Sequence, residues 1–424
     1  MNLLQPDFPK HDLHLFVVWE KSREFLDEIR NDILKHLVIH SSCEVEWSER
    51  NKRENYARFY NRPIQERGTI DEKKGGGRFI VLIASDPKPD YGFTRDDEFS
   101  HDDVASNVFI QNKNVLKVKR LIRIYTSKYG VHSSTNPEEF RHQLVLLFGP
   151  SVASKVMNDP DSQLGILETP FGDCAGAEGW ESLEELFWAL NLCSDYAVVR
   201  KLETFIDEPV EKLKDVDLVV KNATTTCNIV GATSRDHHPA AAKFDVLIGG
   251  KSLFLHCQQV GNGYFDPQWQ RCILNNTQGD RVRVPIPEFN FFGEIYQKLV
   301  YKKEWTESSR TRILVLGQIL GYSTKTINKI FSDYKFSVSL LAHWMCSQGF
   351  VPTTMQEKQR KQISWKTIRD LERHYPRHLD IIRYKRSLGW TARRMKRRIT
   401  DEPTTETRNT KKIIYQLLRF LRLI

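Results

Sequence analysis

The sequence lacks a membrane-spanning segment, a secretory signal and any cluster of cysteines. No apolar run approaches the roughly 18–20 residues that a membrane-spanning helix requires. The start of the chain also lacks the basic region, apolar stretch and small-residue cleavage site of a secretory signal. Seven cysteines are scattered, odd in number and never spaced as CxxC, which speaks against a disulfide framework or a zinc site. We therefore expect a cytoplasmic protein with reduced thiols.

Charge is distributed unevenly along the 424 residues. The net charge is +9 in total, but residues 351–424 hold 20 Lys and Arg against 7 Asp and Glu, a net charge of +13. The first 350 residues hold 43 against 47, a net charge of −4. The chain is too long for one compact core, so we expect two or three domains, with a slightly acidic body and a strongly basic tail.

Apolar periodicity predicts a mixed α+β fold with four successive parts. These are an N-terminal α/β domain, a second α+β domain, a helical extension and a basic helical tail, at residues 1–150, 175–305, 306–350 and 351–424. In the first part, residues 14–19 and 78–85 are apolar runs expected to form buried strands, and a helix is expected from residue 136 until Gly149 and Pro150 end it. Residues 86–105 are rich in Asp, Pro and Tyr and are expected to be irregular.

Two aspartates one residue apart give the clearest candidate for a chemical site. Asp215 and Asp217 enter the apolar run 216–220, and because side chains alternate along a strand, both carboxylates are expected on one face. Such a pair can hold Mg²⁺ beside a triphosphate, since this hard cation prefers oxygen ligands. A polar strand end on a solvated face is the alternative interpretation of the same pattern.

Five sequence blocks around this pair occur in an order that points to a known family. The blocks cover residues 182–191, 196–200, 215–220, 254–269 and 287–302. They resemble the nucleotidyltransferase-like domain of proteins from bacterial capsule and lipopolysaccharide biosynthesis loci. Further blocks at residues 14–19, 44–60, 79–91 and 132–149 extend the likeness over most of residues 11–350, but not over the basic tail.

The resemblance implies an Mg²⁺-dependent nucleotidyl- or phosphoryl-transferase acting in surface-polysaccharide biosynthesis. Its ligands would be a nucleotide or sugar nucleotide and a glycan precursor, with Asp215 and Asp217 as catalytic metal ligands. The remaining substrate-binding candidates in these blocks are Arg200, His256, Asn262, Tyr264, Asp266 and Lys302.

Several positions depart from the family pattern. The residue expected to supply a third carboxylate is His256, and a neutral imidazole is a poorer ligand for Mg²⁺. Asn262 replaces another Asp, and Arg200 with Lys201 stands where the family has Gly-Ser. Asp245 is an alternative third metal ligand if its strand lies adjacent. The alternative to an active transferase is therefore a catalytically degenerate binding or scaffold protein.

His132 and His142 are substrate-binding candidates in the N-terminal part. Asn136 and Glu139 lie between them and are expected to cap a helix start, with Asn136 as N-cap and Glu139 completing a capping box. For the two histidines a functional cleft and a structural role both stay open. The aromatic residues at positions 187, 188, 289, 291 and 292 are expected in the core.

The basic tail can bind anions in two ways. On a membrane it would face anionic head groups, at about 1 kcal/mol per basic residue, and on nucleic acid it would release counterions. Residues 409–424 placed on a helix show a broad apolar stripe with flanking basic residues, as in interfacial amphipathic helices. We expect peripheral attachment at the inner face of the plasma membrane; docking of the helix on the protein body is the alternative, and nucleic acid is less favoured. The anion-binding candidates are Arg393, Arg394, Lys396, Arg397, Arg398, Lys411, Lys412, Arg419 and Arg422.

Overall fold

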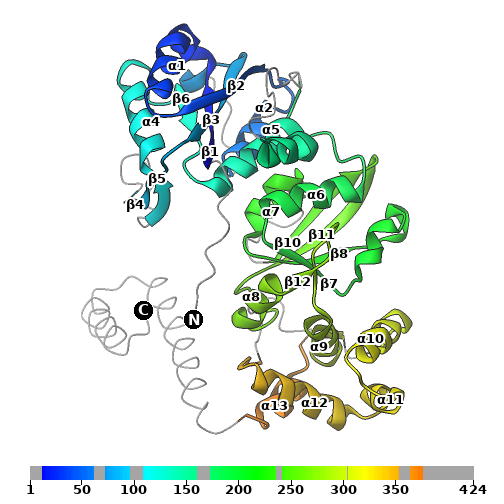
Figure 1. The fold of residues 1–424 in the computed structure, drawn as a ribbon. Coiled ribbons are helices and arrows are strands. Elements are labelled where there is room, and N and C mark those ends of the chain that lie inside the picture. The colour runs from blue at the N-terminus through cyan, green and yellow to red at the C-terminus, as the bar shows by residue number, and fades with distance from the viewer. Residues whose placement is uncertain are drawn as a thin grey trace, which may run out of the picture. The chain divides into compact units, whose positions relative to one another are not determined.

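The computed structural model describes residues 12–61, 72–95, 108–159, 172–234, 241–302, 304–352 and 363–375. Helices and mixed sheets are both present, which confirms the expected α+β class (Figure 1). The chain divides into two compact units, Met1–Gly293 and Glu294–Ile424, and each is described by itself.

The first unit begins with a four-stranded antiparallel sheet. Its strands are β1 (Asp12–Val18), β2 (Val38–Val45), β3 (Phe79–Asp86) and β6 (Val131–Ser133), in the order β2-β3-β1-β6. Every residue of β3 (FIVLIASD) is buried, because helices cover both faces of the sheet. The helical segments of this part are η1 (Glu20–Phe25), α1 (Leu26–Leu34), α2 (Lys52–Phe59), α4 (Lys113–Tyr125) and α5 (Pro137–Asn158).

The two faces of this sheet contribute to different hydrophobic cores. Phe16 on β1 and Leu82 on β3 pack with Ile29 of α1 and Ile122 of α4. The opposite face packs against α2 and α5 in a cluster that continues into the second sheet of the unit. Because side chains alternate along β1 and β3, each strand contributes residues to both cores. The sequences of these two strands are therefore continuous apolar runs.

Two details differ from the sequence-based expectations. The stretch 86–105 is not wholly irregular, because β4 (Tyr91–Arg95) pairs with β5 (Val108–Asn112) in a two-stranded antiparallel sheet. Its cross-strand pair Phe93 and Ile110 is exposed, so no buried apolar pattern marks these strands. Helix α5 is broken at Gly149, which has a φ of 75°, but a second helical segment then begins at Pro150.

The second sheet of the unit carries the aspartate pair. It has the order β7-β8-β11-β10-β9, with β8 parallel to β11 and the other neighbours antiparallel. The hairpin from β10 to β11 turns at Gly249 and Gly250, whose φ values of 55° and 74° suit a residue without Cβ. The strands are β7 (Tyr196–Val199), β8 (Val216–Val220), β9 (Thr233–Ser234), β10 (Ala241–Ile248) and β11 (Lys251–Gln259).

Helices and short strands complete this part of the first unit. They are α6 (Leu183–Cys193), η2 (Glu203–Asp207), η3 (Val210–Lys212), α7 (Ala223–Val230), α8 (Pro267–Asn275), β12 (Thr277–Gln278) and β13 (Val284–Pro285). The buried guanidinium of Arg58, from α2, donates to the carbonyl oxygens of Asn228 and Ile229 at the end of α7 and of Ala175. This side chain ties α2 to α7, whose carbonyl end attracts a cation.

The second unit is helical in its described part. After α9 (Pro287–Gln297), which spans the division between the units, come η4 (Lys298–Lys302), α10 (Glu307–Ile319), α11 (Thr324–Ser332), α12 (Tyr334–Ser347) and α13 (Trp365–Glu372). Helices α10, α11 and α12 lie in the segment 306–350, where the sequence predicted a helical extension. Within the described residues, none of the helices has the length and hydropathy needed to cross a membrane. The basic segments 393–398 and 409–424 lie outside the described residues.

Candidate functional site

Three neighbouring strands of the second sheet, β7, β8 and β11, bring three charged or ionisable side chains together. Asp217 lies on β8, and its register partners are Val199 on β7 and His256 on β11. Because β8 and β11 run parallel with these residues in register, the two side chains emerge side by side. The family resemblance implied a third carboxylate at the position of His256. An imidazole therefore lies beside Asp217 in place of that carboxylate.

Both carboxylate oxygens of Asp217 have a partner. Oδ2 forms an ion pair with Nη2 of Arg200, and Oδ1 lies 3.1 Å from Nδ1 of His256. Arg200 follows β7 with a φ of 65°, a left-handed conformation that is uncommon for a residue with Cβ. The side chain of Asp217 is only 11% exposed and that of Arg200 20%, so solvent screens this pair weakly. A guanidinium therefore neutralises the carboxylate that was expected to bind Mg²⁺.

A chain of amides fixes the orientation of His256. Nε2 of Gln258 lies 3.0 Å from Nε2 of His256, and an amide NH₂ group can only donate. Nε2 of His256 is then the acceptor, and the proton on Nδ1 is donated to Asp217. The side-chain amide of Asn262 donates to Gln258 and accepts over 3.0 Å from the amide of Gln270. Asn262 thus holds Gln258 in place, and Gln258 in turn orients His256. These contacts fit a positioning role for Asn262, which is a substrate-binding candidate.

The other two expected metal ligands lie before β8 and on β10. Asp215 is exposed and lies just before β8. Asp245 lies on β10, the strand next to β11, and its cross-strand partner on β11 is Phe254. The carboxylate of Asp245 accepts from the hydroxyl of Ser252 over 3.1 Å. Across the described ranges, no group of three or more His, Cys, Asp or Glu is placed to hold a metal ion. Magnesium binding by these residues stays a prediction.

Three further substrate-binding candidates occupy different surroundings. Tyr264 is 8% exposed. Asp266 is buried and caps α8 by accepting from the backbone N–H of Gln268 over 2.8 Å. Lys302 is exposed at the end of η4, in the unit Glu294–Ile424. Asp266 therefore has a structural role as the N-cap of α8, because its carboxylate satisfies an N–H group of the first helical turn.

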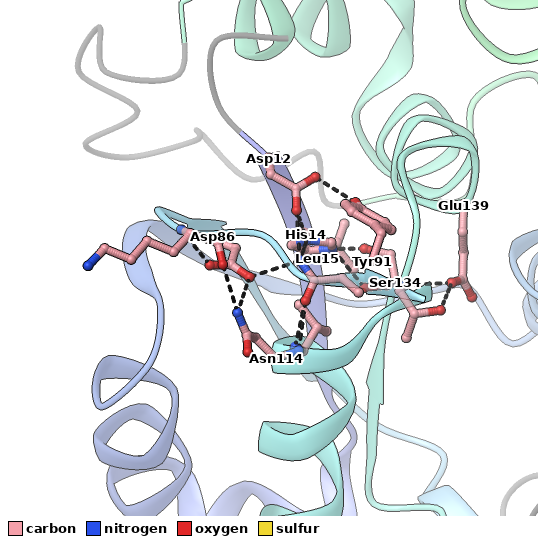
Figure 2. A network of polar contacts seen from close by, with 12 residues as sticks. Asp12, His14, Leu15, Asp86, Tyr91, Asn114, Ser134 and Glu139 are labelled. Carbon is pink, nitrogen blue, oxygen red and sulfur yellow. Dashed lines mark hydrogen bonds and ion pairs between the residues drawn. The ribbon is translucent and has the colours of Figure 1, made fainter. Parts of the chain in front are cut away.

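A buried polar network joins the first sheet to β4 and β5 (Figure 2). Asp12 on β1 and Asp86 on β3 are cross-strand neighbours, and like charges in this arrangement destabilise a sheet. The side-chain amide of Asn112 donates to both carboxylates, over 2.8 Å and 2.9 Å. His14 donates from Nε2 to Asp12 over 2.9 Å, and the hydroxyl of Tyr91 donates to Asp12 over 2.7 Å.

The polar groups of this network stabilise the fold. Burial would raise the pKa of Asp12, but the hydrogen bonds and charge of His14, with the bonds from Tyr91 and Asn112, lower it overall. Oδ1 of Asn112 accepts from the backbone N–H groups of Asn114 and Val115 in the first turn of α4 and so caps that helix. The sequence contains one signal for this network, because Asp12 and His14 are two residues apart and so lie on one face of a strand. The strand expected at residues 14–19 begins after Asp12 and therefore does not include this pair.

His142 and His132 are both buried in the structure. Nε2 of His142 donates to the carbonyl oxygen of Arg58 over 2.8 Å, and burial lowers the pKa of His142 to about 4. His132 contacts Gln143 over 2.7 Å, and burial together with nearby positive charges keeps its pKa well below the usual value. Asn136 caps α5 as expected, by accepting from the backbone N–H of Glu139 over 2.8 Å.

Two hollows in the described structure lie beside the N-terminus of α6. Their volumes are about 290 Å³ and about 490 Å³. Glu181, Glu184 and Arg281 line both, and neither Asp215 nor Asp217 lines either. The larger hollow is also lined by Trp188, whose side chain is 38% exposed. The expectation that residue 188 lies in the core is therefore wrong, because Trp188 is on the solvent side of α6 while its neighbour Phe187 is buried.

Comparisons of the chain with protein-family models, curated proteins and solved structures found no match.

Proposed function

We propose that this chain is a nucleotidyltransferase-like protein that binds a nucleotide or sugar nucleotide without catalysing Mg²⁺-dependent transfer. The observation that carries the proposal is the ion pair between Arg200 and Asp217. A carboxylate that holds Mg²⁺ must offer an oxygen to the metal, and a guanidinium already neutralises this one. His256, which hydrogen-bonds to the second oxygen, adds no negative charge.

The biological setting of the proposal rests on the family resemblance. Proteins with this pattern belong to bacterial capsule and lipopolysaccharide biosynthesis loci, so the second ligand would be a glycan precursor. The basic tail would keep the protein at the inner face of the plasma membrane, where lipid-linked precursors are found. The tail contributes this attachment through charge and an apolar helical stripe, whichever ligand the second sheet binds.

A thermal-shift screen of the full chain tests the proposal. Nucleoside triphosphates and sugar nucleotides are added with Mg²⁺ or with a chelator, and the melting temperature is recorded. We expect at least one of these ligands to raise the melting temperature equally in both conditions. The complete absence of a ligand effect would contradict nucleotide binding and leave a scaffold.

An active Mg²⁺-dependent transferase is the second candidate, because Asp215 is exposed at the start of β8 and free of the Arg200 ion pair. This candidate predicts a gain in melting temperature that requires Mg²⁺ together with the ligand. That gain should disappear in the variant Asp217→Ala. Observing both results would overturn the proposal of a binding protein.

A further inference from the structure

Three aromatic rings in the first unit surround the ammonium group of Lys74. Nζ of Lys74 lies 4.8 Å from the ring centre of Trp19, 4.5 Å from that of Tyr56 and 4.0 Å from that of Tyr60. It also donates to the hydroxyl of Tyr60 over 2.6 Å. Lys74 is only 9% exposed, so its charge is largely removed from water. We call Trp19, Tyr56 and Tyr60 the aromatic box.

The box is held in place by rigid elements. Trp19 follows β1 directly, and Tyr56 and Tyr60 lie four residues apart on and just after α2, so both face the same side of that helix. The ring centres of Tyr56 and Tyr60 are 4.7 Å apart, and Trp19 lies 5.7 Å from Tyr56. Trp47 and Phe79 pack behind Trp19, at 5.8 Å and 4.7 Å. The rings are therefore in place before any ligand arrives.

The box attracts positive charge because three electron-rich ring faces converge on one point. Cation–π attraction is worth about 2 kcal/mol or more when the cation is desolvated. A core built only for packing needs no cation at its centre, and burying an ammonium group costs free energy unless it is compensated. Ring faces attract a cation that has no N–H groups as well as one that has them. A quaternary ammonium ion also costs less to remove from water than the primary ammonium of lysine.

Lys74 reaches the box from the segment 72–77, which forms several hydrogen bonds to neighbouring segments. In residues 72–77, the carbonyl oxygens of Glu72 and Gly76 accept from the ammonium groups of Lys21 and Lys52, and the N–H of Gly77 donates to Glu20 over 2.8 Å. The donors and acceptors of these bonds are mostly at the surface. Gly75, next to Lys74, has a φ of 88°, a conformation that glycine adopts at little cost. Withdrawing Lys74 from the box means breaking these bonds, whereas the rings are fixed on α2 and at the end of β1.

We propose that the aromatic box is a binding site for a quaternary ammonium group, which Lys74 fills while no ligand is bound. Lys74 competes with the ligand, so the box is open to a ligand only when the segment 72–77 moves away. The site is separate from Asp217 and its partners, and it takes a cation where the proposed nucleotide site takes an anion.

Calorimetric titration with choline tests the proposal. The variant Lys74→Ala should bind choline at least about tenfold more tightly than the wild type, because the competing ammonium is gone. Its neutral carbon isostere, 3,3-dimethylbutan-1-ol, should not bind, since the ring faces attract charge. Lys73→Ala, on the same segment but with its ammonium over Tyr129, is the matched control and should behave like the wild type.

Two results would overturn the proposal. One is a folded Lys74→Ala protein, judged by circular dichroism, that binds choline no better than the wild type. The other is equal binding of choline and its neutral isostere, which would show an apolar cavity. If Lys74→Ala does not fold, the wild type is titrated to high choline concentration with tryptophan fluorescence as the readout. Quenching that saturates and is lost in Tyr56→Leu would support the box, and unchanged quenching in Tyr56→Leu would contradict it.

Discussion

Asp217 and His256 face each other across the parallel strands β8 and β11, with Oδ1 of the carboxylate 3.1 Å from Nδ1 of the imidazole. On the other side of Asp217, the guanidinium of Arg200 completes the pairing. His256 and Arg200, two positions at which the chain differs from the family that it resembles, thus act together, because one lacks a carboxylate and the other adds a cation. Together they make the site more positively charged, which suits a site that works without Mg²⁺. Reversing both charge changes tests this interpretation.

Removing the internal cation and adding a carboxylate should create a metal site. The double variant Arg200→Ser with His256→Asp removes the internal cation and puts a carboxylate beside Asp217, which is the oxygen-rich environment that Mg²⁺ and Mn²⁺ prefer. We expect Mn²⁺ to bind this variant at least about tenfold more tightly than the wild type in calorimetric titration. Arg200→Ser with His256→Gln removes the cation without adding a carboxylate and serves as the control. Equal Mn²⁺ affinity of wild type and double variant would contradict the prediction.

Neutralising Asp217 should destabilise the protein. Asp217→Asn leaves Arg200 without its counter-charge in a poorly exposed position, and we expect the free energy of unfolding to fall by about 2 kcal/mol. An empty metal site predicts the opposite sign, because removing one of several clustered carboxylates relieves repulsion. Urea unfolding measures the difference, with the exposed Asp215→Asn as the control, expected within about 0.5 kcal/mol of the wild type.

The sequence predicts what depends on local pattern. The apolar run after Asp215 identified β8, because a buried strand is visible in its own residues. The spacing of Asn136 and Glu139 likewise identified the cap of α5. The register places His256 beside Asp217 on the neighbouring strand β11, and the role that the resemblance implies for this position stays a prediction.

The remaining features depend on contacts between distant segments. The ion pair from Arg200 requires a left-handed backbone at that residue and the register of β7 with β8, and neither is encoded in a motif. Lys74 reaches its aromatic box only because the chain returns to β1 and α2. The exposure of Trp188 depends on which side of α6 meets the sheet, and its apolar neighbours hide that distinction in the sequence.

Removing residues 404–424 should abolish binding to anionic liposomes. These residues contain the apolar stripe with flanking basic residues, and an interfacial helix needs both for stable attachment. Co-sedimentation with vesicles containing phosphatidylserine measures the loss, and purely zwitterionic vesicles show how much of the binding is electrostatic. Unchanged binding of the truncated chain to anionic vesicles would show that this segment is not the anchor.

Replacing Arg58 should destabilise the first unit. Its guanidinium donates to three backbone carbonyl oxygens, so Arg58→Met leaves buried acceptors without donors. We expect a loss of about 2–4 kcal/mol in the free energy of unfolding. Arg53→Met, at an exposed position of the same helix, is the control and should change stability little. A small effect of Arg58→Met would mean that water replaces these bonds.

The buried His142 should make stability fall in mild acid. Burial lowers its pKa to about 4, whereas an unfolded chain takes up the proton near pH 6.5. The unfolded state therefore binds more protons between these values, and stability is complete above about pH 7 and is lost as the pH falls toward 4, by at most about 3 kcal/mol from this residue. His142→Gln keeps an N–H donor for the carbonyl oxygen of Arg58 but cannot titrate. Urea unfolding at several pH values should thus show that stability depends less steeply on pH in His142→Gln than in the wild type, by up to about one proton taken up on unfolding. Some pH dependence should remain, because His132 is present in both proteins. His343→Gln, at an exposed position, should keep the wild-type slope, and a wild-type slope in His142→Gln would show that this histidine does not govern the acid response.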